Sequence, residues 1–344
     1  MNMLGPLKWF LGIHILRNRA TRTLWLSQEA YVDKLAHQYL HADDRLGKMP
    51  TTPMTTEELL PFDGQATNSS IHSYQRKTGS ILFATITTRP DVAFAASRLA
   101  RFNQNPSAEH HTAANRVIQY MYGTKGLALT FGKQQQGLQS LICASDASFA
   151  DNSIDRKSSQ GYVILLFGGP IAWRANKQDT VTTSTTEAEL LALSQTAKES
   201  IFVSRMLRQM TLELNEPLVI QCDNNMTLRL VTEESAKLTT KLRHVDIHSH
   251  WLRQEYRERR VHVKWVPTAE MIADGLTKAL PSQRHTHFVN LLGMEDIQTR
   301  LEQERRMEDL REQIKASRLK ETEQEHTVYL IHQGRKGRLR RRWL

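Results

Sequence analysis

The chain has 344 residues, of which 40% are hydrophobic and 24% are charged, as in globular proteins of one or two domains. No apolar run reaches the roughly 18 residues that span a bilayer, and the start lacks the basic segment and cleavage site of a signal peptide. A membrane protein and a secreted protein are therefore not expected. Cys143 and Cys222 lie in apolar, strand-like runs, which favours an intracellular setting, cytoplasmic or nuclear, and leaves a disulfide between them as the alternative.

The formal net charge is +10, and much of it is concentrated at the carboxyl end. Residues 334–344 contain no acid and six basic residues, which are Arg335, Lys336, Arg338, Arg340, Arg341 and Arg342. Such a tail attracts nucleic acid, because contacts to phosphates release condensed counterions. The alternative is a solvated, disordered end that acts as a nuclear address.

The amino-terminal part predicts two strands followed by helices. The strand-like runs lie within residues 7–16 and 24–28. An amphipathic helix comes next, and its apolar side carries Ala30, Val32, Leu35, Ala36 and Tyr39. Residues 46–70 are rich in Thr, Pro, Gly, Asn and Ser and predict a long loop. Residues 71–125 predict three helical pieces, with Pro90 and Pro106 in the first turns of the second and third.

Residues 133–138 predict a polar linker, and the pattern changes beyond it. Three consecutive strands are expected at 141–145, 161–168 and 170–176. The last two are joined at Gly168-Gly169 in a hairpin-like arrangement. A long helix follows, for which Ser184 and Glu187 form an S-x-x-E capping box. A strand is expected next at 217–222, followed by a short helix and then by a longer helix at 244–256. A strand at 261–266 and a last short helix at 269–279 complete this part. This order predicts an α/β or α+β layer fold around a mixed sheet.

Four acidic residues occupy strand ends or helix starts that can direct them to one point. They are Asp146, Glu189, Asp223 and Asp274. Four carboxylates around one point cannot all ionise in a dry site without divalent cations to neutralise them. Two such cations about 3.5–4 Å apart can hold the attacking and leaving oxygens of a phosphodiester. The pattern therefore favours a metal-dependent nuclease.

Each acid also has an ordinary structural interpretation. Asp146 can lie in a turn, and Glu189 can be a first-turn acid favoured by the helix dipole, while its neighbour Glu187 takes the capping role. Asp223 can cap the helix that follows it, and Asp274 can be a surface acid. The combination in this order of elements is more specific than any of the four alone.

Three further groups of side chains admit two interpretations each. Three histidines of one expected helix, His244, His248 and His250, admit a zinc site as the alternative to an ordinary structural role. The first two are four residues apart and so lie on one face of the helix. Phosphate contacts, or a solvated basic face, are expected for Lys237, Lys241, Arg243 and Arg253. Trp173 and Trp265 lie in strand candidates and are expected in the core rather than as base-stacking platforms.

Several of these segments, in this order, resemble the ribonuclease H domain of copia-type retrotransposon polyproteins. The matching motifs include DRKSSQGYVILLFGGPIAWRANKQ, STTEAELLALSQTAKE, QCDNN, LRHVDIHSHWLRQEY and VPTAEMIADGLTK. The upstream part is similar to the stretch that follows the reverse-transcriptase active site, through LGPLKWFLGI, LSQEAYVDKL, TRPDVAFAASRLARFNQNPSAEHH and NRVIQYMYGTKGLAL. The resemblance covers about residues 1–294.

The resemblance implies a ribonuclease H-like mixed five-stranded sheet with flanking helices, preceded by a mostly helical reverse-transcriptase remnant. The implied divisions are 1–132 for the remnant, 138–294 for the ribonuclease H-like domain, and 295–344 for a charged helix with a basic tail. In that family the residues matching Asp146, Glu189, Asp223 and Asp274 hold two Mg²⁺ ions, for which Mn²⁺ can substitute. The implied activity is hydrolysis of the RNA strand of an RNA–DNA hybrid, and no membrane partner is expected.

The chain also departs from the family pattern. The polymerase motif Y-x-D-D is absent, so no DNA synthesis is expected. Cellular ribonucleases H carry a histidine shortly before the last aspartate, and VPTAEMIA has none. Ser148 and Phe149 replace the usual acidic or aromatic residues after the first aspartate. The alternative function is that of a catalytically inactive retroelement remnant that binds nucleic acid or a partner from the element.

Overall fold

The computed structural model describes residues 6–132, 139–212, 214, 217–234, 236, 240, 242–315 and 317. It divides into two compact units, Met1–Asp296 and Ile297–Leu344. In the second unit, residues 298–315 are helical, and the side chains of Met307, Leu310 and Ile314 are exposed. The linker expected at 133–138 and the basic tail lie outside the described residues. Among the described helices, none is both long and apolar enough to cross a membrane.

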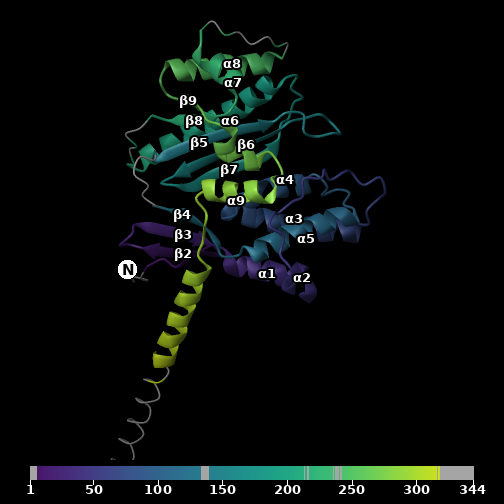
Figure 1. The fold of residues 1–344 in the computed structure, drawn as a ribbon, viewed down its shortest axis with the longest axis vertical. Helices are drawn as coiled ribbons and strands as arrows, with labels where there is room; N and C mark the ends of the chain where they lie inside the picture. Colours follow the sequence, from purple (N-terminus) through teal and green to yellow (C-terminus); the bar gives the residue numbers. More distant parts are fainter. Residues whose placement is uncertain are drawn as a thin grey trace, which may run out of the picture. The chain divides into compact units, whose positions relative to one another are not determined.

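The amino-terminal part of the first unit contains an antiparallel five-stranded sheet and a group of helices (Figure 1). The strands follow one another across the sheet as β1 (Trp9–Phe10), β2 (Ile13–Asn18), β3 (Thr23–Ser27), β4 (Leu127–Phe131) and β10 (Glu295–Asp296). The helical elements are α1 (Glu29–Tyr39), α2 (Ala42–Leu46), α3 (Asn68–Thr87), η1 (Pro90–Val92), α4 (Ala93–Ala100) and α5 (Ala108–Gly123). The sequence did not predict β4 and β10, whose pairing partners lie far away in the chain.

Side-chain caps explain where two of these helices begin. The Thr67 side chain accepts a hydrogen bond from the main-chain N–H of Ser70 at the start of α3. Ser107 caps α5 by accepting from the His110 N–H, and the His110 ring accepts from the Ser107 N–H in return. Pro106 therefore precedes the cap, and the expectation that it lies in the first turn was wrong. Pro90 does begin its 3-10 turn.

The second sheet is mixed and has the strand order β7-β6-β5-β8-β9. Its strands are β5 (Leu141–Ser148), β6 (Ser159–Leu166), β7 (Gly169–Lys177), β8 (Val219–Cys222) and β9 (His262–Trp265). The first three form an antiparallel meander, and β8 and β9 add to β5 in parallel. The expected ribonuclease H-like mixed five-stranded sheet is confirmed. The β6–β7 turn is formed by Phe167 and Gly168, both with positive φ, and Gly169 already belongs to β7.

Side chains on the two faces of this sheet enter different cores. Cys143 and Ile164 face α6 (Thr185–Gln209), which with α7 (Asn225–Thr232) and α8 (Arg243–Arg257) covers one side (Figure 1). Their neighbours Ala144 and Val163 face the 3-10 turn η3 (Ile272–Leu276) and helix α9 (Ser282–Leu291). This alternation is the period of two expected for strands covered on both faces. Because β5 is the central strand of this sheet, the residues at its carboxyl end are shielded from solvent on both faces.

The last expected helix, at 269–279, forms instead as two 3-10 turns, η2 (Thr268–Glu270) and η3. Tertiary contacts account for the difference, because η3 packs closely on β5 and β6. A Cβ added at Gly161 would lie 2.6 Å from the Cβ of Leu276. Glycine at this position on β6 therefore permits η3 to approach the strand pair, at the point where Gly161 lies opposite Asp146.

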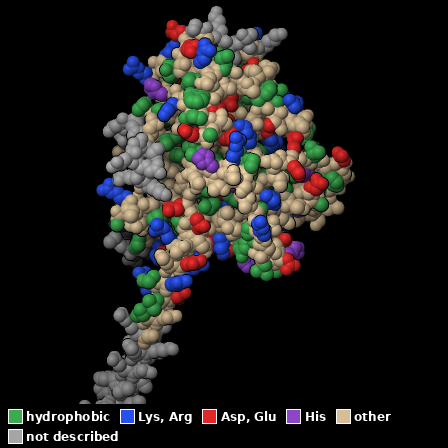
Figure 2. Space-filling model, in the orientation of Figure 1, with side chains coloured by type: hydrophobic (Ala, Val, Ile, Leu, Met, Phe, Trp, Pro, Cys, Tyr) green, Lys and Arg blue, Asp and Glu red, His purple; other side chains and the backbone are tan. Residues whose placement is uncertain are grey.

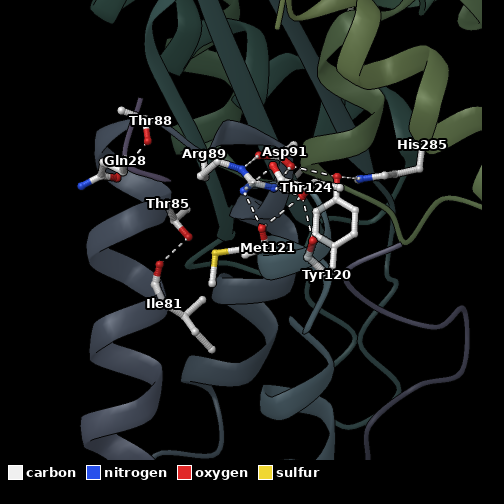
Figure 3. A network of polar contacts seen from close by, with 10 residues as sticks. All are labelled: Gln28, Ile81, Thr85, Thr88, Arg89, Asp91, Tyr120, Met121, Thr124 and His285. Carbon is white, nitrogen blue, oxygen red and sulfur yellow. Dashed lines mark hydrogen bonds and ion pairs between the residues drawn. The ribbon is translucent and has the colours of Figure 1, made fainter. Parts of the chain in front are cut away.

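A buried polar network joins the two halves of the first unit (Figure 3). The Arg89 guanidinium donates two hydrogen bonds to the Asp91 carboxylate, at 2.8 and 2.7 Å, and a third to the Thr124 hydroxyl. The Tyr120 hydroxyl donates to Asp91 at 2.9 Å and accepts from the His285 ring of α9, also at 2.9 Å. This network ties η1 and α5 to α9, and the pairing of β10 with β4 adds the segment that follows α9 to the first sheet.

Candidate metal centre

Asp146 lies near the carboxyl end of the central strand β5, and its side chain is almost completely buried. The Thr277 hydroxyl donates a hydrogen bond to its carboxylate. Burial raises the pKa of Asp146 to about 6, an effect that the Lys278 ammonium and the Thr277 hydroxyl oppose. The turn expected as its alternative setting is absent, because β5 continues through Ser148.

Glu189 lies in the first turns of α6, where its neighbour Glu187 takes the structural role. Ser184 caps the helix, and the Glu187 carboxylate accepts from the main-chain N–H and the hydroxyl of Thr183. Glu189 is buried, and its Oε2 has no hydrogen-bond partner among the described residues. Burial, followed by the nearby charges of Asp146 and Asp223, raises the pKa of Glu189 to about 9.

Asp223 follows β8 directly, and the interpretation of this residue as a helix cap was wrong. The cap of α7 is Asn224, whose side chain accepts from the Thr227 N–H. The Asp223 carboxylate is therefore available, and it accepts from the Thr268 hydroxyl at 2.9 Å. Its main-chain oxygen accepts from the indole N–H of Trp265. Trp265 was expected in the core, but it is 42% exposed.

The carboxylates of Asp146, Glu189 and Asp223 converge, each offering an oxygen within 4.8 Å of the others. Asp274 is not part of this close group, although it is buried in η3 rather than on the surface. The Lys278 ammonium lies between, 2.5 Å from Asp274 Oδ1 and 3.6 Å from Asp146 Oδ2. The structure thus brings three of the four predicted acids together and places the fourth beside them, across a lysine.

The donor set fits a divalent cation. Carboxylate oxygens are the ligands that Mg²⁺ and Mn²⁺ favour. Glu189 Oε2 is a buried acceptor with no partner in the described part of the chain, next to two further carboxylates, and such an arrangement is costly unless a cation neutralises it. Lys278 supplies one positive charge to the group, on the side of Asp146 and Asp274. No second cluster of three or more metal-binding side chains occurs in the part of the chain that the structure describes.

The other predicted groups do not converge in the same way. The His248 ring is hydrogen-bonded to the Ser194 hydroxyl at 2.9 Å, and the exposed His250 lies 3.6 Å from Asp246, so the helical histidines do not form the alternative zinc site. Arg243 begins α8 and is exposed. Lys237, Lys241 and the six basic residues of the tail lie outside the described residues. Figure 2 shows lysine and arginine interspersed with acidic side chains over one face of the molecule.

Sequence reasoning missed two residues of this region, Thr277 and Lys278. The signal that was available is spacing, since Lys278 follows Asp274 by four residues. Both also line a cavity of about 520 Å³ that lies between the two halves of the first unit. Its wall is formed by residues 54–62 and α4 on one side, and by the β5–β6 loop on the other. Thr277 and Lys278 therefore connect the cavity to the Asp146 carboxylate, which both contact.

Comparison with known proteins identifies relatives over most of the chain. The chain is 33% identical over 300 residues to a retrovirus-related Pol polyprotein from transposon TNT 1-94 of Nicotiana tabacum, covering 86% of this chain and 22% of the relative. It is 31% identical over 289 residues to the corresponding protein from transposon RE1 of Arabidopsis thaliana, covering 84% of this chain and 19% of the relative. No family model matches the chain.

A solved N-terminal ribonuclease H domain from Mycobacterium tuberculosis, fused to maltose binding protein, is similar over 44% of this chain and 96% of its own. The identity is 13% and the TM-score 0.31, so the fold assignment rests on the strand order and not on this likeness. The chain spans about a fifth of the length of the curated relatives above. On its similarity to those relatives, the chain belongs to the retrovirus-related Pol polyproteins of copia-type transposons.

Proposed function

We propose that this chain is a ribonuclease that hydrolyses the RNA strand of an RNA–DNA hybrid with two divalent metal ions. The observation that carries the proposal is the unpartnered, buried Oε2 of Glu189 beside Asp146 and Asp223. An acidic side chain in that position is costly to the fold of the free protein, and a bound cation removes the cost. Membership of the Pol polyprotein family supports the hybrid as the substrate.

Each carboxylate has a defined task in this proposal. Asp146, Glu189 and Asp223 provide oxygen ligands, and Asp274 provides a fourth on the side of Asp146. Divalent cations, when bound, activate water and stabilise the leaving 3′-oxygen of the phosphodiester. Thr277 holds the Asp146 carboxylate through its hydroxyl, and Thr268 holds that of Asp223. These hydrogen bonds orient the ligands, as the surrounding groups of metal sites usually do.

Substrate recognition follows from the shape of the hybrid rather than from its base sequence. The minor groove of an RNA-containing duplex is wide and exposes 2′-hydroxyls, which a protein contacts without reading bases. The cleft between residues 54–62 and the β5–β6 loop is lined by both halves of the unit, including Thr277 and Lys278, which contact Asp146. It offers a route for one strand toward the metal centre.

The proposal predicts that Asp146→Asn abolishes cleavage of a labelled hybrid in Mg²⁺ and leaves hybrid binding intact. An amide keeps the shape of the side chain but removes the negative charge that holds the metal. Asp246→Asn is the matched control, because Asp246 is an exposed acid on α8 outside the cluster. Equal cleavage by the wild type and Asp146→Asn would contradict the proposal. Binding without cleavage by the wild type would favour the inactive remnant.

A further inference from the structure

The Lys278 side chain lies at the metal centre and contacts two of its carboxylates. Its ammonium is 2.5 Å from Asp274 Oδ1, four residues earlier in the chain, and 3.6 Å from Asp146 Oδ2. The Asp146 side chain is 1% exposed and that of Asp274 10% exposed, whereas that of Lys278 is 39% exposed. The lysine is therefore half-buried and is the most accessible of the three side chains.

We propose that Lys278 is a resident cation, which holds Asp146 and Asp274 in the metal-free protein and competes with a divalent ion for them. This inference rests on the proposed function and adds a control on metal occupancy to it. An ammonium and a divalent cation repel one another at this distance, so a metal ion bound by both carboxylates requires the ammonium to leave. Lys278 is thus a positioning residue for Asp146 and Asp274. It does not contact Glu189 or Asp223, so these two carboxylates stay accessible to a metal ion.

The cleft beside Lys278 provides the place to which the ammonium moves when it leaves the carboxylates. Lys278 lines the cleft between the two halves of the unit, together with Thr277 and Ala279. Lysine carries its charge on a flexible four-carbon stem, which can turn from the carboxylates into that cleft without a change in the main chain. In the cleft, the ammonium is available to a phosphate of the bound nucleic acid. Nucleic acid and metal would therefore favour the same position of the side chain.

The geometry of Lys278 differs from that of Lys177, which lines the same cleft. The Lys177 ammonium is 2.6 Å from Asp155, an acid of the β5–β6 loop outside the carboxylate group. Lys177→Gln removes the same charge from the same cleft and leaves the metal ligands with their partners. It is the matched control for Lys278→Gln, while Lys278→Arg keeps the charge.

The test is titration of the full chain with Mn²⁺, without nucleic acid, by calorimetry and by electron paramagnetic resonance. Lys278→Gln is expected to bind Mn²⁺ about tenfold more tightly than the wild type, or to add a second site, because it removes a competing charge. Lys278→Arg and Lys177→Gln are expected to bind as the wild type does. In chelator, Lys278→Gln is expected to melt at a lower temperature than the wild type, and to gain more from added Mn²⁺.

Unchanged or weaker Mn²⁺ binding by Lys278→Gln would overturn the inference. A melting temperature in chelator equal to that of the wild type would also overturn it, because the lysine would then not hold the acids. These outcomes are separate from the failure of the proposed function, which would appear as a wild type that binds metal but does not cut the hybrid.

Discussion

At the scale of single residues, neighbours with ordinary structural tasks leave the acids of the metal centre available. Asn224 caps α7 and Glu187 turns back to Thr183, so neither Asp223 nor Glu189 is needed to cap its own helix. Sequence reasoning identified these acids because each follows a strand or begins a helix. It could not identify Lys278, because an i, i+4 pair with Asp274 is ordinary on any helix and only the approach of η3 to β5 makes it part of the site.

Glu189→Gln tests the cost of the unpartnered carboxylate. In chelator at neutral pH, the variant is expected to be more stable than the wild type by about 1–3 kcal/mol, because the raised pKa makes Glu189 take up a proton on folding, whereas the glutamine amide is already neutral and can donate to a neighbouring carboxylate. Added Mg²⁺ is expected to raise the melting temperature of the wild type more than that of the variant. Chemical unfolding with and without Mg²⁺ measures both effects. A variant less stable than the wild type in chelator would show that Glu189 is already satisfied in the free protein.

At the scale of elements, the sequence anticipated the strands and helices that carry long periodic runs. Strands β5 to β9 and helix α6 appear close to where the pattern placed them, because alternation and capping are local properties. Strands β4 and β10 and the 3-10 turns η2 and η3 were not anticipated. Their conformations depend on partners far away in the chain, such as Gly161 beneath η3, which a local pattern does not contain.

The contact between α9 and the amino-terminal half predicts a dependence of stability on pH. Burial lowers the pKa of His285 below its ordinary value of 6.5, an effect that Arg89 assists and Asp91 opposes. On acidification, His285 takes up its proton at a higher pH in the unfolded chain than in the folded protein. Its contribution to the free energy of unfolding is therefore fully present above pH 6.5 and is lost as the pH falls below that value. Burial also lowers the pKa values of His110, His111 and His248, so acidification is expected to reduce their contributions to stability as well.

Urea unfolding between about pH 7.5 and pH 5.5 measures this dependence. His285→Gln is expected to lose less stability on acidification than the wild type, because the glutamine amide can donate to Tyr120 but does not titrate. The exposed His250 provides the control variant, His250→Gln, which is expected to follow the wild type. Parallel pH profiles for His285→Gln and the wild type would contradict the assigned role of this network.

At the scale of the whole molecule, the two sheets of the first unit are linked by a shared core, in which Leu129 of β4 lies with Ala144 and Val163 of the second sheet, and by the hydrogen bond between His285 on α9 and Tyr120 on α5. The division into residues 1–132, 138–294 and 295–344 stays a prediction, as do the intracellular location and the nucleic-acid contacts of Lys237, Lys241, Arg243 and the tail. Composition located the tail but not its partner, because a run of arginines has the same pattern whether it binds phosphate or is solvated.

Deletion of residues 334–344 tests the tail. Loss of its six basic residues is expected to reduce the slope of log affinity against log salt for hybrid binding, because fewer counterions are released. The rate of cleavage at saturating hybrid is expected to stay unchanged, since the deletion leaves the carboxylates intact. A salt titration of binding to a labelled hybrid provides the slope. If the slope is the same with and without the tail, these residues do not contact phosphates.

The most direct measurement of the central claim compares three labelled duplexes of one sequence, an RNA–DNA hybrid, an RNA duplex and a DNA duplex, incubated with the wild-type chain. In Mg²⁺, we expect cuts in the RNA strand of the hybrid alone, with 5′-phosphate and 3′-hydroxyl ends, and in chelator no cuts. Cleavage that persists in chelator, or a hybrid left intact in Mg²⁺ by a folded chain, would contradict it.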